Sequence, residues 1–173
     1  MSDTVDLAPM LEALWPPGEA GKTEVYAVLD GARDRRIEYL LLLWGLEHEC
    51  LYGAVGPELR NAAPFLVRLE RDGAGTLELI RESAGKDWGV FAVAPAGTGM
   101  RVVGRHCRRM LRVLDEEGEI MLFRYYDPKV LATFWTTASA AQHAELLGQL
   151  SRWLGDLCVK QVKSKQKSQP DYS

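Results

Sequence analysis

The sequence predicts an α/β protein, in which a mixed sheet of about four or five strands is packed with helices and followed by a C-terminal helix. Short apolar segments typical of strands alternate with longer segments that keep apolar residues at helical spacing. The chain has 173 residues, of which 47% are apolar, so we expect one domain with a substantial core. The sequence contains no internal repeat.

The first quarter of the chain already shows this alternation. Residues 5–15 form an amphipathic pattern and predict a short helix, which a Pro-Pro-Gly run ends. Residues 24–29 are typical of a strand, and an Asp-Gly pair turns the chain after it. Residues 32–44 return to helical spacing and predict a second helix, followed by a short strand at residues 50–54.

The middle of the chain continues with shorter segments. One helical turn is expected to open at residues 57–59, and residues 65–69 alternate apolar and polar side chains as a strand does. Residues 77–84 fit either a helix or a strand, and we interpret them as a helix. Residues 88–94 are apolar almost throughout, which predicts a strand buried inside the sheet.

The clearest helix is predicted at residues 100–114, followed by a short turn and a strand at residues 119–125. Asp127 is a typical helix cap, and Pro128 is favoured at the first helical position because its missing N–H costs no hydrogen bond there. These two residues predict a helix that ends near residue 137.

A capping-box pattern begins the predicted last helix, which we place at residues 139–157. The Lys-rich residues 160–173, which include Lys160, Lys163, Lys165 and Lys167, are expected to form a polar tail. The chain is therefore divided into a main domain at residues 1–137 and a C-terminal helix with its tail at residues 138–173.

Composition excludes several classes of protein. The net charge of -3 indicates neither a nucleic-acid partner nor an anionic membrane. Cys50, Cys107 and Cys158 are odd in number and form no CxxC pair, which argues against a disulfide framework and favours a reducing compartment. We expect no secretory signal, and the apolar run 39–45 is too short to cross a bilayer. A cytoplasmic protein is expected.

No motif predicts a catalytic, metal-binding or cofactor-binding site. The loop Gly97-Thr98-Gly99 precedes a helix, as phosphate-binding loops do, but it lacks a third glycine and is interpreted as a plain turn. His106 and Cys107 are adjacent on a helix and point about 100° apart, so they make a poor catalytic pair. The alternative is a hydrolase or transferase that uses Asp30, Asp127 or Cys107.

Two surfaces are candidates for binding a partner. The first is an arginine stripe on the helix at residues 100–114, opposite its apolar face. It consists of Arg101, Arg105, Arg108 and Arg112. The stripe is either a docking face or a solvated face. As a docking face it would bind an acidic partner or a phosphate backbone, which leaves weak nucleic-acid binding as an alternative. Arg109 lies beside the stripe and is expected to make a structural ion pair.

The second candidate surface belongs to the last helix. Leu146, Leu150 and Trp153 share one helical face. This face either closes over the core or stays open to a partner helix.

Five short segments occur in an order that points to a known family. They are Tyr26-Ala27-Val28-Leu29-Asp30-Gly31-Ala32, Ala63-Pro64-Phe65-Leu66-Val67-Arg68-Leu69, Trp88-Gly89-Val90-Phe91, His106-Cys107-Arg108-Arg109-Met110-Leu111 and Phe123-Arg124-Tyr125-Tyr126-Asp127-Pro128-Lys129-Val130-Leu131. Together they resemble a bacterial family of type VI secretion adaptor-chaperones associated with VgrG spikes. Cys107 replaces the family's usual leucine and Lys129 its usual arginine.

The resemblance implies a function. Proteins of this family bind a toxic effector in the cytoplasm and help load it onto the VgrG spike, and they are not enzymes themselves. Residues 1–137 would then form the adaptor domain, with an effector and a spike as protein partners. Most of the run from Phe123 to Pro128 is expected to be architectural, which leaves Arg124 and Tyr126 to contact a partner or neighbouring loops. The sequence indicates no oligomeric state.

Overall fold

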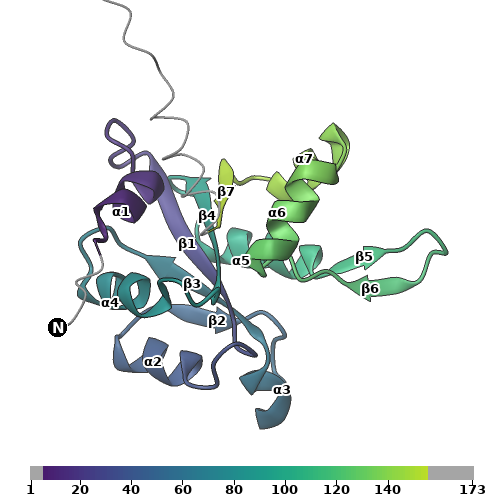
Figure 1. The fold of residues 1–173 in the computed structure, drawn as a ribbon, viewed down its shortest axis with the longest axis horizontal. Coiled ribbons are helices and arrows are strands. Elements are labelled where there is room, and N and C mark those ends of the chain that lie inside the picture. Colours follow the sequence, from purple (N-terminus) through teal and green to yellow (C-terminus); the bar gives the residue numbers. More distant parts are fainter. Residues whose placement is uncertain (1–5, 156–173) are drawn as a thin grey trace, which may run out of the picture.

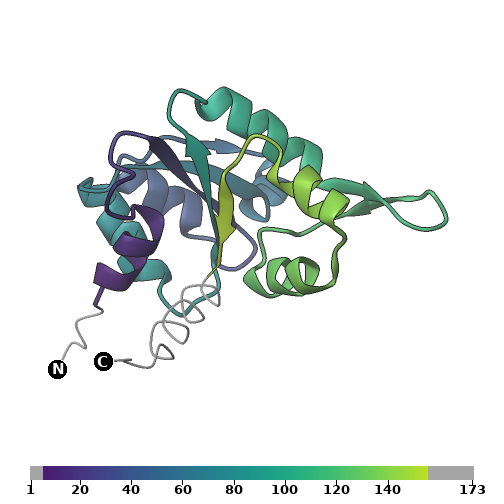
Figure 2. The ribbon, with the colours of Figure 1, turned by 90° about the horizontal axis from the view of Figure 1, so that it is seen from above.

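The computed structural model describes residues 6–155, which form a sheet with helices on both faces (Figures 1 and 2). The helices are α1 (Ala8–Leu14), α2 (Ile37–Leu43), α3 (Pro57–Asn61), α4 (Ala74–Ser83), α5 (Met100–Met110), α6 (Pro128–Thr137) and α7 (Ala140–Leu147). The strands are β1 (Thr23–Asp30), β2 (His48–Cys50), β3 (Pro64–Leu69), β4 (Gly89–Pro95), β5 (Arg112–Leu114), β6 (Ile120–Leu122) and β7 (Arg152–Leu154).

The main sheet has five strands in the order β2-β3-β1-β4-β7, and β5 and β6 form a separate two-stranded sheet. The α/β class and the number of strands are confirmed. Every neighbouring pair in the main sheet is antiparallel, so the expected mixture of strand directions is wrong.

The central strand β1 is buried on both faces because its side chains alternate between two cores. Tyr26 and Val28 pack with buried residues of α5, α6 and α7. Val25, Ala27 and Leu29 pack with buried residues of α1, α2 and α4 on the opposite face. The continuous apolar sequence of β1 therefore matches its central position.

Several predicted bounds shift in the structure. The second helix begins at Ile37 rather than at residue 32, because the Asp34 side chain accepts the backbone N–H of Arg36 at 2.9 Å and holds a turn before it. The strand expected at residues 50–54 is β2 at His48–Cys50. Of the ambiguous segment 77–84, all residues but Ala84, the C-cap, lie within α4, which confirms the helix.

The helix predicted at residues 100–114 ends at Met110, and the next residues form a hairpin. Residues 112–114 pair with residues 120–122 across the predicted turn, where the Asp115 side chain accepts the backbone N–H of Glu119 at 2.7 Å. Gly118 adopts a positive φ of 81°, which glycine tolerates best. The strand expected at residues 119–125 is correspondingly shorter, because residues 123–127 turn towards α6.

The last predicted helix, at residues 139–157, ends at Leu147, so the prediction is wrong for residues 148–155, and residues 156 and 157 lie outside the described residues. The expected capping box at Ser139 is present, but Gly148 adopts a positive φ of 55° and the chain reverses. Residues 152–154 then form β7, which pairs with β4 inside the main sheet. This strand lies beyond the division that we placed after residue 137. Val5, Cys158 and the lysines of the predicted tail lie outside the described residues.

Candidate functional site

The hairpin formed by β5 and β6 extends away from the body of the protein in both ribbon views (Figures 1 and 2). Its strands carry five large apolar side chains that are between 39% and 69% exposed. These are Val113, Leu114, Ile120, Met121 and Leu122. Because neighbouring residues of a strand point to opposite faces, both faces of the ribbon carry exposed apolar side chains.

This composition is unusual for a ribbon in water. A strand exposed on one face normally alternates apolar and polar residues, whereas consecutive apolar residues are typical of strands covered on both faces. An isolated two-stranded hairpin is also only marginally stable in water. We therefore take the hairpin as the candidate site, since another surface covering it would both remove apolar area from water and stabilise it.

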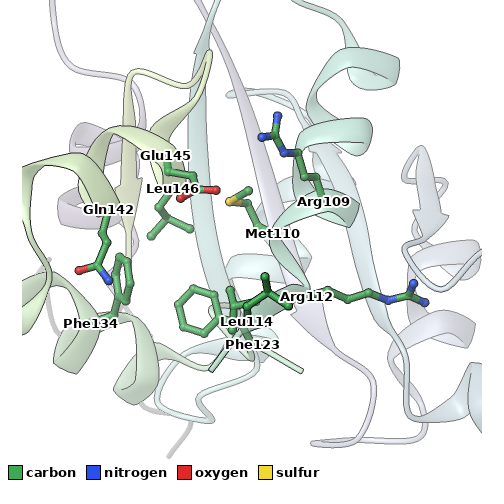
Figure 3. A pocket seen from close by; sticks show the side chains of 10 residues that line it. Arg109, Met110, Arg112, Leu114, Phe123, Phe134, Gln142, Glu145 and Leu146 are labelled. Atoms are coloured by element: carbon green, nitrogen blue, oxygen red, sulfur yellow. The ribbon is translucent and has the colours of Figure 1, made fainter. Parts of the chain in front are cut away.

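A cleft lies beside the hairpin where it joins the body, and we call it the base cleft (Figure 3). It has a volume of about 410 Å³ and lies between α5, the hairpin, α6 and α7. Met110, Phe123, Phe134 and Leu146 supply its apolar wall, and the rings of Phe123 and Phe134 are 5.1 Å apart between centroids. Gln142 and Glu145 of α7 add polar groups.

The run from Phe123 to Pro128 fixes this site to the sheet. The Arg124 guanidinium pairs with the buried carboxylate of Asp30 at the end of β1. The hydroxyl of Tyr125 donates to the backbone carbonyl of Cys107 on α5 at 2.8 Å. Since both contacts cross to other elements, they set the position of the hairpin and of α6 relative to the core.

Asp127 completes the attachment with both of its carboxylate oxygens. Oδ1 accepts the backbone N–H of Lys129 at 2.9 Å and caps α6, while Oδ2 accepts Arg33 at 2.7 Å. Burial opposes ionisation of this carboxyl, but the Lys129 N–H and the Arg33 guanidinium outweigh it and hold the pKa of Asp127 below its ordinary value. The expectation that this run is largely architectural agrees with these contacts.

Of the two residues of this run left for a partner or a neighbouring loop, the structure buries Tyr126 and pairs Arg124 with a buried carboxylate. Tyr126 is only 1% exposed and packs in the core, so the expectation that it is free is wrong. Arg124 is exposed, but its guanidinium pairs with Asp30 at the end of β1, which is close to the expected alternative of pairing with a neighbouring loop.

The arginine stripe is shorter than predicted. Arg101, Arg105 and Arg108 are exposed on α5, whereas Arg112 belongs to β5 because the helix ends before it. Arg108 pairs with Glu49 at 3.0 Å, a role that we expected of Arg109. Arg109 and Arg112 instead lie where the hairpin meets the body.

Leu146, Leu150 and Trp153 do not form a surface open to a partner helix. All three are buried in the core on the α5 side of the sheet. Trp153 lies on β7, and its indole N–H donates to the carbonyl of Leu146 at 3.0 Å. The alternative in which these residues close over the core is therefore confirmed, although through a reversal of the chain rather than one long helix.

The glycine loop before α5 holds an anion of its own. The backbone N–H groups of Gly97 and Gly99 donate to the Glu24 carboxylate at 2.9 and 2.8 Å, and the Tyr26 hydroxyl donates to it at 2.8 Å. Burial raises the pKa of Glu24, but these hydrogen bonds outweigh it and leave the pKa below its ordinary value. The donors that a phosphate would need are thus already used.

The residues considered for catalysis occupy structural positions. Burial raises the pKa of the fully buried Cys107 thiol to about 12, which disfavours the nucleophilic thiolate. Asp30 and Asp127 do approach the same side chain, Arg33, at 3.7 and 2.7 Å, but arginines occupy both carboxylates. Within residues 6–155 no three metal-binding side chains come together, and no helix is long and apolar enough to cross a membrane.

Sequence reasoning missed the hairpin as a site because it extended the helix at residue 100 over Arg112, Val113 and Leu114. A signal was present nonetheless. The Asp-Glu-Glu-Gly turn lies between two apolar runs, as expected of a hairpin.

Comparison with known proteins places these features in a family. Residues 25–145 match the model of a family described as Domain of unknown function (DUF4123). The chain belongs to the DUF4123 family. The DUF4123 match includes the hairpin, the run from Phe123 to Pro128 and most of the base cleft, and this family is associated with effector adaptors of type VI secretion systems. No curated protein and no solved structure matches the chain.

Proposed function

We propose that this protein is a non-enzymatic adaptor that binds a type VI secretion effector in the cytoplasm and helps load it onto the VgrG spike. The observation that carries the proposal is the projecting hairpin with apolar side chains on both faces. Membership of the DUF4123 family supports the same role, because the family is associated with effector adaptors.

The effector would bind along the face of the hairpin that carries Val113 and Met121 and continue into the base cleft. These two side chains lie opposite each other in the ribbon, and Val113 lines the cleft. Phe123 and Phe134 offer an apolar wall there, with Glu145 at its edge. Apolar anchors surrounded by polar groups are typical of the centre of a protein interface.

The expected size of the interface is moderate. A stable specific complex buries about 800 Å² on each partner, which is more than the hairpin face alone offers, so neighbouring parts of α6 and α7 would contribute. Full burial of an exposed aliphatic side chain contributes about 1.5–3 kcal/mol. Replacing Val113 and Met121 by aspartate should therefore weaken the complex by at least about tenfold.

Co-expression tests the proposal directly. The tagged full-length chain is produced together with the effector and the VgrG protein encoded beside it, and captured complexes are analysed. We expect both proteins to be recovered with the wild-type chain, and effector recovery to fall for V113D/M121D. The matched control is L42D/L43D, which places the same charges on α2, where both leucines are exposed as well.

Two results would contradict the proposal. One is that the chain recovers neither protein while its gene deletion leaves effector delivery unchanged. The other is an equal loss of effector with V113D/M121D and with L42D/L43D, because the hairpin would then have no special part in binding.

A further inference from the structure

The hairpin has a second face, which we call the outer face. Cross-strand pairing places Arg112 opposite Leu122 and Leu114 opposite Ile120, and strand alternation puts all four on this face. Leu114 and Ile120 are each 69% exposed, so they are the most exposed large apolar side chains of the described residues. The outer face therefore has an apolar stretch that begins at an arginine near the body.

At the body, the outer face continues into an open groove of about 730 Å³, the outer groove. Leu51, Val55 and Leu59 supply apolar lining, and Leu122 joins it from the hairpin. Arg108, Arg109 and Arg112 line the same groove. Figure 3 shows the guanidinium group of Arg112 directed away from Phe123 and Phe134 of the base cleft.

The far end of the hairpin has the opposite charge. Asp115, Glu116, Glu117 and Glu119 form the tip, separated only by Gly118. Within the part of the chain that the structure describes, none of these four side chains makes an ion pair, and neither Arg109 nor Arg112 does. The hairpin is thus acidic at its tip, apolar along its length and basic at its base.

From this layout we propose that two copies of the chain pair through their outer faces, with the hairpins antiparallel. A two-fold axis across the middle of the ribbons places the tip of each copy in the outer groove of the other. Glu116 and Glu117 then meet Arg109 and Arg112, and the apolar stretches around Leu114 cover each other. A parallel pairing would instead bring the two acidic tips together.

A second copy fits this face because the face is complementary to itself. In the antiparallel pair, each charged end of the face lies against the oppositely charged end of the other copy. The apolar middle of the face lies against the identical apolar middle. The pairing requires only this chain, so it does not depend on the adaptor role. It leaves Val113 and Met121 open on the other face of the hairpin, while the base cleft shares Arg109, Arg112 and Leu114 with the paired surface.

Charge reversal tests the arrangement with the full-length chain. The tip variant E116R/E117R and the base variant R109E/R112E each place like charges in contact in the antiparallel pair. Sedimentation equilibrium should show a wild-type dimer by about 100 µM and a dissociation constant at least about tenfold higher for either variant alone. An equal mixture of the two variants should restore pairing, because each altered end then meets its opposite charge.

A second pair of variants tests the apolar part. L114D/I120D should shift the protein to the monomer, whereas L42D/L43D on α2 should leave the wild-type equilibrium unchanged. Circular dichroism checks that each variant retains the wild-type fold. A wild-type chain that stays monomeric up to about 100 µM would overturn the proposal, as would a variant mixture that stays monomeric while the wild type pairs.

Discussion

Replacing Asp127 by alanine removes two contacts that the structure assigns to different oxygen atoms. Oδ1 caps α6 through the backbone N–H of Lys129, and Oδ2 accepts Arg33. Loss of a helix cap costs about 1 kcal/mol. The Arg33 side chain is 35% exposed, so this ion pair is partly screened by solvent and contributes up to about 1 kcal/mol. D127A should therefore lower the free energy of unfolding by about 2 kcal/mol.

Asparagine separates the two contributions. D127N keeps an oxygen that caps α6 but loses the charge that attracts Arg33, so it should cost about half as much as D127A. Urea unfolding followed by tryptophan fluorescence at pH 7 measures both changes. A loss of about 2 kcal/mol shifts the midpoint by about 1 M for a typical urea dependence.

Two results would contradict these contributions of Asp127. Equal costs for D127N and D127A would show that the cap contributes nothing of its own. A double-mutant cycle of D127N with R33A should give a coupling of up to about 1 kcal/mol, and additive effects would show that the ion pair does not stabilise the fold. Because Arg33 also approaches Asp30, the cycle is needed rather than R33A alone.

The same residue predicts a dependence on pH. The pKa of Asp127 is lower in the folded protein than its ordinary value, so its ionisation stabilises the fold above about pH 4, the pKa of an unfolded aspartate. This stabilisation is lost as the pH falls through the folded-state pKa. The difference in unfolding free energy between the wild type and D127N should therefore shrink towards zero on acidification, and a constant difference would contradict the assignment.

Three further predictions concern the attachment of the site and the loop before α5. Y125F removes the hydroxyl that donates to Cys107 and leaves a buried carbonyl without its donor, which should cost about 1–3 kcal/mol in urea unfolding. G89A places a Cβ against the backbone oxygen of Val28 in β1, so the measured unfolding temperature should fall far more than for G56A, where only the chain neighbours lie within 4 Å. E24Q should lower the urea midpoint at neutral pH, and its difference from the wild type should diminish as the pH falls, because the folded-state pKa of Glu24 is depressed.

The hairpin illustrates where local pattern and tertiary structure differ. Arg112, Val113 and Leu114 continue the spacing of α5, and nothing local forbids a longer helix there. What ends α5 is the partner strand β6, which gives these residues cross-strand hydrogen bonds after the turn at Asp115. Because this strand pairing joins residues that are apart in the sequence, the spacing of apolar residues within one short segment does not predict it.

The end of the chain shows the same limit. Leu146, Leu150 and Trp153 have helical spacing, but the free edge of β4 accepts Arg152–Leu154 as a fifth strand once Gly148 reverses the chain. Burial of Trp153 beside Leu146 then satisfies the apolar side chains without a helix. The spacing of these apolar residues is compatible with a helix and with a strand after a turn. The open edge of β4 favours the strand.

By itself, the sequence determined the α/β class, most of the elements, the cap at Asp127 and the family, because these follow from local periodicity, capping chemistry and recognisable segments. Only the tertiary structure decided that Arg124 pairs with Asp30, that Glu24 occupies the glycine loop and that the apolar side chains of the hairpin stay exposed. These features depend on which distant residues lie side by side, and packing of the whole chain sets that.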